Sequence, residues 1–329
     1  MKKSVENTVV AEIGLLIYPD CQLAAVYGLT DMFRIAADWA VSISGEEQVR
    51  AIRVSHWQVM PDTHTVECVW DSHPETPHRL SHAIAPPSLV MPARMRPMTA
   101  PAAWMSALYH DGVTLCSVCA GAFVLAETGL IDHRRATTHW AFAQTLSERF
   151  PEIEVAAENM VIDDGDIITA GGILAWTDLG LTLIEKLLGT GTMLATARFL
   201  LIDPPRRKQN TYSAFIPHFE HGDREILRVQ HHLHAHYSAH QSIDDMAELA
   251  RMTPRTFLRR FQKATGVRPT EYLQQVRIMK ARDALELSGR SADRIAWEVG
   301  YTDPSAFRKI FRKITGVTPS QYRERFGLE

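Results

Sequence analysis

One short phrase occurs twice near the C-terminus of this 329-residue chain, and the repeat constrains the fold more than any other feature. The segment FQKATGVRPTEY (residues 261–272) returns as FRKITGVTPSQY (residues 311–322). Each copy follows an apolar helical pattern that opens with a serine, breaks before a proline and restarts. In the first unit Ser242 is followed by Asp245 three residues later, as in a capping box. Each copy therefore predicts two short helices joined by a tight turn, a helix-turn-helix.

The second helix of each unit has clear boundary signals. It is expected to begin near Pro254 or Pro304, because a proline fits the first turn of a helix. It is expected to end at Gly266 or Gly316, where glycine favours a left-handed C-terminal cap. Residues 270–289 have the length and spacing of a helix that links the two units.

The same second helices separate an apolar stripe from a polar face. Phenylalanines four residues apart form the stripe, which should face the core. The residues off the stripe are Arg255, Thr256 and Arg259 in the first unit and Ser305, Arg308 and Lys309 in the second. Such side chains reach guanine edges or phosphates in a major groove. Two units held about one DNA turn (~34 Å) apart could read successive grooves, so we expect the phrase to repeat because DNA presents its groove periodically.

Charge is distributed unevenly along the chain. Residues 223–329 carry 19 Lys/Arg against 13 Asp/Glu, whereas the remaining residues carry 16 against 25. This asymmetry predicts that the C-terminal part meets a polyanion and the N-terminal part does not. The alternative interpretation is a basic face that is simply solvated.

The segment VGYTDPSAFRKIFRKITGVTPSQYR (residues 299–323) resembles the signature of AraC-type transcriptional regulators. The resemblance spans roughly residues 223–326 and implies a bipartite DNA-binding domain. It implies that the six residues off the apolar stripes face DNA. Leu258 stands where many relatives carry a polar base-reading residue, so the first unit is expected to read bases weakly.

A domain boundary is predicted where IDPPRRKQNTYSAF (residues 202–215) combines paired prolines, three consecutive basic residues and no apolar period. The predicted domains are residues 1–201 and 223–329, with a linker at 202–222. Upstream, strand patterns alternate with helical ones, which predicts an α/β doubly wound, mostly parallel sheet. The patterns are strands near 9–18, 86–92 and 112–118, helices near 23–40 and 176–188, and a hairpin with Asp164-Gly165 at its turn. Downstream, an all-α domain is expected.

The first residues, MKKSVENTVVAEIGLLIYPDC, mimic a signal peptide. Glu12 interrupts the apolar stretch and no small-residue cleavage pattern follows, so we interpret it as a first strand. No apolar run reaches the roughly 18–20 residues that span a bilayer. Four cysteines in so long a chain do not make a disulfide scaffold. A cytoplasmic location and no membrane partner are expected.

The N-terminal part has one pointed chemical signal, the stretch GVTLCSVCAGAFVLAETGLIDHRRATTHW (residues 112–140). Cys119 falls where a strand ends and a helix begins, and helix N–H groups there would lower the thiol pKa. His139 could approach it as a Cys–His pair. The stretch resembles the nucleophile elbow of the PfpI (ThiJ) family, whose doubly wound sheet is related to class-I glutamine amidotransferases. With the AraC resemblance, the whole chain is similar to GlxA-type regulators, which fuse these two modules.

The sequence departs from the enzymes of that family at two turns. Asp20 stands at the glycine of the first turn, and Ala25 stands where an acid would hydrogen-bond the elbow cysteine. Pro92-Ala93-Arg94 replaces a second Pro-Gly-Gly turn that helps form an oxyanion pocket, and its last two residues adopt positive φ less freely than glycine. Loss of both aids predicts that the domain is not an enzyme. A small-ligand pocket is expected instead, near Cys119, Ala120, His139 and Arg94.

The sequence thus predicts a transcriptional regulator with an N-terminal sensory and dimerising domain. An effector would shift dimer geometry or linker order, and so the spacing of the DNA-binding modules. The expected partners are double-stranded DNA, a small-molecule effector and a second copy of the chain, with RNA polymerase a further candidate; no cofactor or metal is expected. Three alternatives stay open: a PfpI-type hydratase or amidase using Cys119 and His139, a redox sensor at Cys119, and an elbow that binds nothing.

Overall fold

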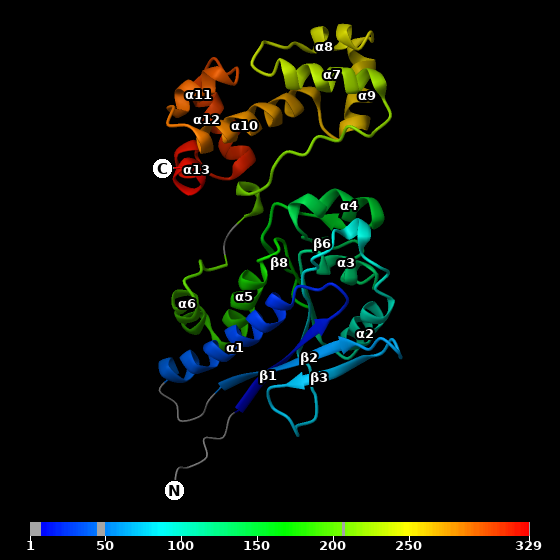
Figure 1. The fold of residues 1–329 in the computed structure, drawn as a ribbon, viewed down its shortest axis with the longest axis vertical. Helices are drawn as coiled ribbons and strands as arrows, with labels where there is room; N and C mark the ends of the chain where they lie inside the picture. Colours follow the sequence, from blue (N-terminus) through cyan, green and yellow to red (C-terminus); the bar gives the residue numbers. More distant parts are fainter. Residues whose placement is uncertain (1–7, 45–49, 206–207, 329) are drawn as a thin grey trace. The chain divides into compact units, whose positions relative to one another are not determined.

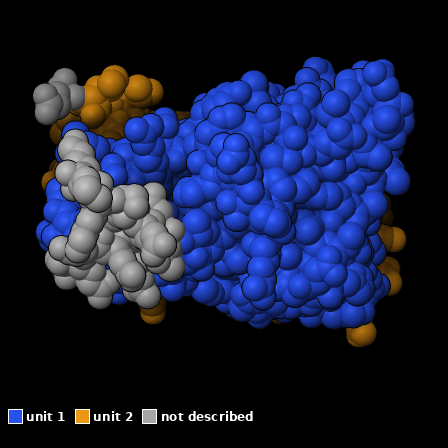
Figure 2. All heavy atoms as spheres, turned by 90° about the horizontal axis from the view of Figure 1, so that it is seen from below, with its two compact units in different colours: residues 1–209 blue, residues 210–329 orange. Residues whose placement is uncertain are grey.

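The computed structural model describes residues 8–44, 50–205 and 208–328. The chain divides into two compact units, Met1–Gln209 and Asn210–Glu329, which are coloured separately in Figure 2. This division falls inside the predicted linker. The first seven residues of the signal-like start and two of the three consecutive basic residues, 206–207, lie outside the described residues. Within the described ranges, no helix is long and apolar enough to cross a membrane.

A seven-stranded sheet forms the centre of the first unit (Figure 1). Its order is β3-β2-β1-β4-β5-β9-β8. The five central strands β2, β1, β4, β5 and β9 run parallel to one another. The edge strands β3 and β8 are antiparallel to theirs. The strands are β1 Thr8–Ile17, β2 Arg50–Val59, β3 Val66–Asp71, β4 His82–Ala85, β5 Thr114–Val118, β8 Val161–Asp163 and β9 Ile167–Ala170. A separate pair joins β6 Arg135–Ala136 to β7 Glu154–Val155.

Helices cover both faces of this sheet, which explains why β4, β5 and β9 are mostly buried and apolar. Helices α1, α5 and α6 pack together on one face, and α2 and α3 pack against β4 and β5 on the other (Figure 1). The helices are α1 Leu23–Ser44, α2 Thr99–His110, α3 Gly121–Ala126, α4 Ala143–Arg149, α5 Trp176–Leu188 and α6 Thr190–Phe199, with 3-10 turns η1 Pro92–Arg94, η2 Trp140–Phe142 and η3 Gln209–Thr211. The predicted mostly parallel α/β fold is confirmed.

One local prediction is wrong, and one hairpin was not predicted. Residues 86–92 form a loop that ends in η1, and the strand there is β4, which ends at Ala85. Pro86 and Pro87 explain the shift, because proline cannot donate to a strand ladder. The hairpin of β2 and β3 had no counterpart in the sequence interpretation; β3 has three exposed and three half-buried residues and carries two acids.

In the second unit, the helix α10 lies between the group α7, α8 and α9 and the group α11, α12 and α13 (Figure 1). It contributes to two small hydrophobic cores, one in each group. The first core surrounds Phe257 and Phe261, and the second surrounds Phe307 and Phe311. Helix α10 contributes Tyr272, Leu273 and Val276 to the first core and Ile278, Ala281 and Leu285 to the second. The helices are α7 Arg224–Ala235, α8 Ile243–Leu249, α9 Pro254–Thr265, α10 Pro269–Leu287, α11 Ala292–Glu298, α12 Pro304–Thr315 and α13 Pro319–Phe326. The predicted all-α domain with two helix-turn-helix units is confirmed.

The predicted caps are present in both units. Ser242 and Asp245 form a capping box at the start of α8. Gly266 and Gly316 end α9 and α12 in the left-handed region, with φ of 77° and 81°. Glycine is suited to this conformation because it has no Cβ. The two glycines fix where each second helix stops, and the side chains of Thr253 and Asp303 cap its start.

Candidate DNA interface and elbow site

Helix α9 presents a basic outer face. Arg255 and Arg259 are exposed, and within the described ranges neither side chain has a hydrogen-bond or ion-pair partner. Thr256 is half-buried, and its hydroxyl accepts a hydrogen bond of 3.0 Å from Thr253. Leu258 lies between the two arginines with 39% of its surface exposed. The structure thus leaves two guanidinium groups free to meet an anion.

Helix α12 differs from α9 at the position of Leu258. Ser305 and Lys309 are exposed, as the DNA-facing prediction requires. Arg308, which corresponds to Leu258, instead forms an ion pair with Asp293 of α11, and both side chains are about half exposed. An exposed pair of this kind contributes little stability and can be exchanged for another anion. Asp293 therefore holds Arg308 in this structure, and Arg308 can still exchange Asp293 for a phosphate.

The repeated phrase itself forms turns and cores. The Thr265 hydroxyl lies 2.8 and 3.0 Å from the carbonyl oxygens of Phe261 and Val267, and Thr315 repeats both distances in the second unit. The phenylalanine ring also packs on the tyrosine that ends the phrase, with centroids 5.4 Å apart in the first unit and 5.5 Å in the second. The shared letters thus build the scaffold of each unit, and the outward residues differ between the units.

Cys119 forms a strained elbow between β5 and α3. Its φ is 56°, which is uncommon for a residue with a side chain. The Cys119 amide donates to Ala170 on β9, and its carbonyl accepts from the Thr138 hydroxyl at 2.8 Å. A Cβ on Gly121 would lie 2.2 Å from the Ala85 carbonyl oxygen, so only glycine fits there. The sheet, the helix and the 137–140 segment thus converge on this cysteine.

The elbow thiol is not activated in this conformation. Cys119 is 1% exposed, and this burial raises its pKa to about 12, although a hydrogen bond from the Ala120 amide partly opposes the rise. The expected lowering of the pKa is therefore wrong, because desolvation outweighs the helix N–H groups. Within the described ranges no hydrogen bond joins Cys119 to His139. The His139 imidazole instead accepts from the Ala141 amide, and partial burial lowers its pKa.

The two departures from the enzyme pattern leave marks on the backbone. Asp20 adopts φ of 64°, as a turn glycine would, and Ala25 is fully buried. Ala93 and Arg94 adopt no positive φ and lie in η1, so the second turn is rebuilt as expected. Arg94 is exposed, whereas Cys119 and Ala120 are buried.

Gln209, which the sequence interpretation did not single out, is buried beside the elbow segment. Gln209 is only 2% exposed. Its Nε2 lies 3.1 Å from the Thr137 hydroxyl, 2.9 Å from the Thr138 carbonyl oxygen and 2.9 Å from the Asn159 carbonyl oxygen. Its Oε1 accepts from the Trp140 amide at 3.2 Å. The last residue of the first unit is therefore tied to the segment that holds the Cys119 carbonyl.

Both units match known families. Residues 89–186 match the DJ-1/PfpI family, and residues 246–325 match a helix-turn-helix domain family. The chain is a DJ-1/PfpI-type domain fused to an AraC-type helix-turn-helix domain. The predicted resemblance to GlxA-type regulators is confirmed by two curated relatives.

Among curated relatives, the fused chain is similar to two regulators. It is 29% identical over 203 residues to the HTH-type transcriptional regulator CdhR of Pseudomonas aeruginosa, covering 61% of this chain and 60% of the relative. It is 30% identical over 197 residues to the HTH-type transcriptional regulator GlxA of Rhizobium meliloti, covering 59% and 60%. The chain thus spans about 60% of the length of these relatives. The isonitrile hydratase of Pseudomonas putida is 42% identical over 77 residues, covering 23% of this chain and 32% of the enzyme.

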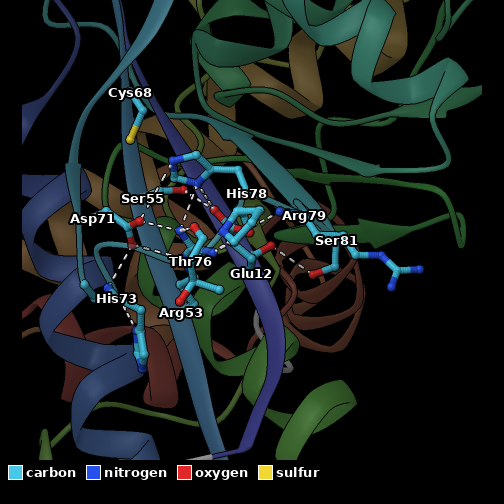
Figure 3. Close-up of polar contacts among 12 residues, drawn as sticks. Glu12, Arg53, Ser55, Cys68, Asp71, His73, Thr76, His78, Arg79 and Ser81 are labelled. Atoms are coloured by element: carbon cyan, nitrogen blue, oxygen red, sulfur yellow. Dashed lines mark hydrogen bonds and ion pairs between the residues drawn. The ribbon is translucent and has the colours of Figure 1, made fainter.

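A second polar cluster lies in the DJ-1/PfpI-type domain, across β1, β2 and β3 (Figure 3). The Glu12 carboxylate accepts from the Ser55 hydroxyl at 3.0 Å and from the Arg79 amide at 2.7 Å, and it lies 2.6 Å from a His78 nitrogen. Arg53 joins it at 3.3 Å and also pairs with Asp71. The cluster ties residues 72–81 to the sheet.

The charges of this cluster are mutually satisfied. Partial burial opposes ionisation of Asp71, yet hydrogen bonds from Arg53 and from the His73 amide hold its pKa below the usual value. Arg53 also donates to the carbonyl oxygens of Thr76 and Pro77. A buried network with its partners in place is expected to fix one arrangement of the chain. We assign the cluster a structural role. This role accounts for Glu12, the residue that interrupts the apolar start of the sequence.

Proposed function

We propose that the chain is a transcriptional regulator that binds double-stranded DNA through its AraC-type domain. The observation that carries the proposal is the pair of outward basic faces on α9 and α12, each built on its own core at either end of α10. One helix, α10, whose 19 residues span about 28 Å at roughly 1.5 Å per residue, contributes to both cores, so the two faces are held in a fixed relation, as reading of successive major grooves requires. The positive balance of residues 223–329 supports the same partner.

The test is DNA affinity measured against salt concentration, with Arg259→Ala as the central variant. We expect a steep fall of affinity with salt, because phosphate contacts release counterions. We expect Arg259→Ala to weaken binding by about 1–3 kcal/mol if its guanidinium contacts a base. Lys280→Ala is the control, because it removes one positive charge from α10 and leaves both α9 and α12 unchanged. Binding that ignores salt, or equal losses in both variants, would contradict the proposal.

The DJ-1/PfpI-type domain is proposed to sense a small effector and to dimerise. The candidate pocket remains the elbow region of Cys119, Ala120 and His139, with Arg94 as a candidate anion contact. Support comes from the convergence of three segments on Cys119 and from the attachment of the domain's last residue to one of them. An effector bound there would change the conformation of the linker, residues 202–222, which we call the connector. The DNA-binding domain would then be placed differently. A regulator of this kind acts where the DNA is, so a cytoplasmic location accompanies the proposal, with RNA polymerase as a candidate contact.

The second candidate function is catalysis of the PfpI type, favoured by the short similarity to isonitrile hydratase. The buried, protonated thiol and the separate hydrogen bonding of His139 weigh against it. Cys119→Ala distinguishes the two functions. A regulator keeps its effector response in reporter assays and shows no turnover of candidate substrates before or after the change. Turnover that disappears with the thiol would establish the enzyme, and loss of the response under peroxide would favour a redox sensor.

A further inference from the structure

The groups around the Gln209 side chain form a small recognition site, which we call the amide cradle. It consists of the Thr137 hydroxyl, the carbonyl oxygens of Thr138 and Asn159, and the Trp140 amide. Thr137 and Thr138 are fully buried. The cradle thus offers three acceptors to one nitrogen and one donor to one oxygen, all within 3.2 Å.

This pattern selects one chemical group. A primary carboxamide or carbamoyl group carries an NH₂ whose two N–H groups are shared among the three acceptors, beside an oxygen that accepts from the Trp140 amide. A carboxylate would place an oxygen against three oxygens. An ammonium or guanidinium group would leave the Trp140 amide without an acceptor, and a buried unpaired donor is costly.

The shape of the cradle depends on Gly171 at the end of β9. A Cβ on Gly171 would lie 1.9 Å from Nε2 of Gln209 and 2.3 Å from its Cδ. The same addition at Gly172 would meet nothing within 4 Å. Space for the amide therefore comes from one residue that lacks a side chain.

The residues that follow Gln209 are bound to the second unit. The Thr211 hydroxyl donates to the Thr315 carbonyl oxygen at 3.0 Å, and Arg282 donates to the Asn210 carbonyl oxygen at 2.9 Å. Thr211 is 6% exposed. The cradle therefore holds the connector immediately before the point where the connector joins the DNA-binding unit.

We propose that the amide cradle is a ligand site for small molecules with a primary carboxamide or carbamoyl group, and that Gln209 occupies it in the absence of such a ligand. A ligand that displaces Gln209 releases the connector, and this step transmits the signal. The inference deepens the proposed function, because it names the chemistry of the effector and the contact that the effector replaces.

Chemical rescue of Gln209→Ala tests the cradle. This change removes the atoms of one acetamide molecule and leaves the cradle open. The probe is acetamide, with acetate as the isosteric control, and the readout is the thermal midpoint of the first unit in the full chain. We expect the variant to unfold at a lower temperature and acetamide to raise its midpoint more than that of the unchanged protein. Acetate should have no such selective effect. Equal shifts in both proteins would overturn the proposal.

A second pair of variants tests the connector without altering Gln209. Gly171→Ala should expel the amide, whereas Gly172→Ala is the matched control. We expect hydrogen exchange to become about tenfold faster, or more, at residues 137–142 and 208–213 in Gly171→Ala, because buried hydrogen bonds are lost. Acetamide should not reverse this effect, since the new methyl group fills the cradle. Unchanged exchange in Gly171→Ala would contradict the inference. None of these readouts needs DNA, so a chain that binds no DNA but shows the rescue would refute only the proposed function.

Discussion

The Cys119 thiol combines a strained backbone with a closed environment. Positive φ at a non-glycine residue is typical of nucleophile elbows, where the side chain is aimed at a substrate. Here the side chain is 1% exposed and its pKa is raised to about 12, so the thiol is protonated at neutral pH. The thiolate is the reactive form, and a protonated buried thiol reacts slowly.

Thiol labelling should therefore distinguish Cys119 from Cys68. All four cysteines are free, and Cys68 is the partly exposed one. At pH 7.5 or thereabouts we expect a disulfide reagent to modify Cys68 first and to leave Cys119 unmodified until the domain is unfolded by urea. Peptide mass analysis after timed quenching gives the order, and Cys68→Ser provides the control. Rapid labelling of Cys119 in the folded protein would show an open elbow and would reopen the enzyme and redox interpretations.

Individual residues were predictable where a local backbone rule applied. Asp20 takes the turn conformation expected of the glycine it replaces, and Gly266 takes the left-handed cap. Gln209 could not be found in this way. Its partners lie 50 to 72 residues away along the chain, and no local pattern marks a glutamine that will be buried by them. Arg308 was correctly placed on the outer face, but its partner Asp293 lies on the preceding helix and was missed.

At the scale of elements, the repeat predicted helices, turns and caps because it encodes them directly. Capping residues, prolines and C-terminal glycines act within a few positions of each other, so their effect follows from spacing. Strands β2 and β3 escaped prediction because β3 has no regular alternation of buried and exposed residues and pairs only at an edge of the sheet. The residues expected to face DNA are those that vary between α9 and α12, and only the frame around them repeats.

The difference between the two reading helices gives a test at this scale. Asp293→Asn should free Arg308 and remove a negative charge near the reading face. We expect tighter DNA binding, by about 0.5–1 kcal/mol, and a log–log salt slope steeper by about one. Asp244→Asn is the matched control. Asp244 occupies in α8 the position that Asp293 occupies in α11, but its unit has Leu258 where the second unit has Arg308. Fluorescence anisotropy over a salt series measures both effects. Equal changes in the two variants would show that Arg308 gains nothing by its release.

At the scale of the whole molecule, the sequence predicted two modules of different class, and both are present. Alternating patterns indicated the α/β unit, and the charge asymmetry indicated which unit would meet a polyanion. The division at Gln209 lies within a stretch whose composition suggested only a linker. Its docked residues make it a structural part of both units, because Gln209 is bound in the first and Thr211 in the second.

Hydroxyl-radical footprinting of the full chain on a selected DNA site tests the central claim most directly. Two helices at the ends of α10 should protect two segments on one face of the duplex, with centres about 10 base pairs apart. Arg259→Ala should weaken one segment and Lys309→Ala the other. A single protected segment, or two segments on opposite faces of the duplex, would contradict the account.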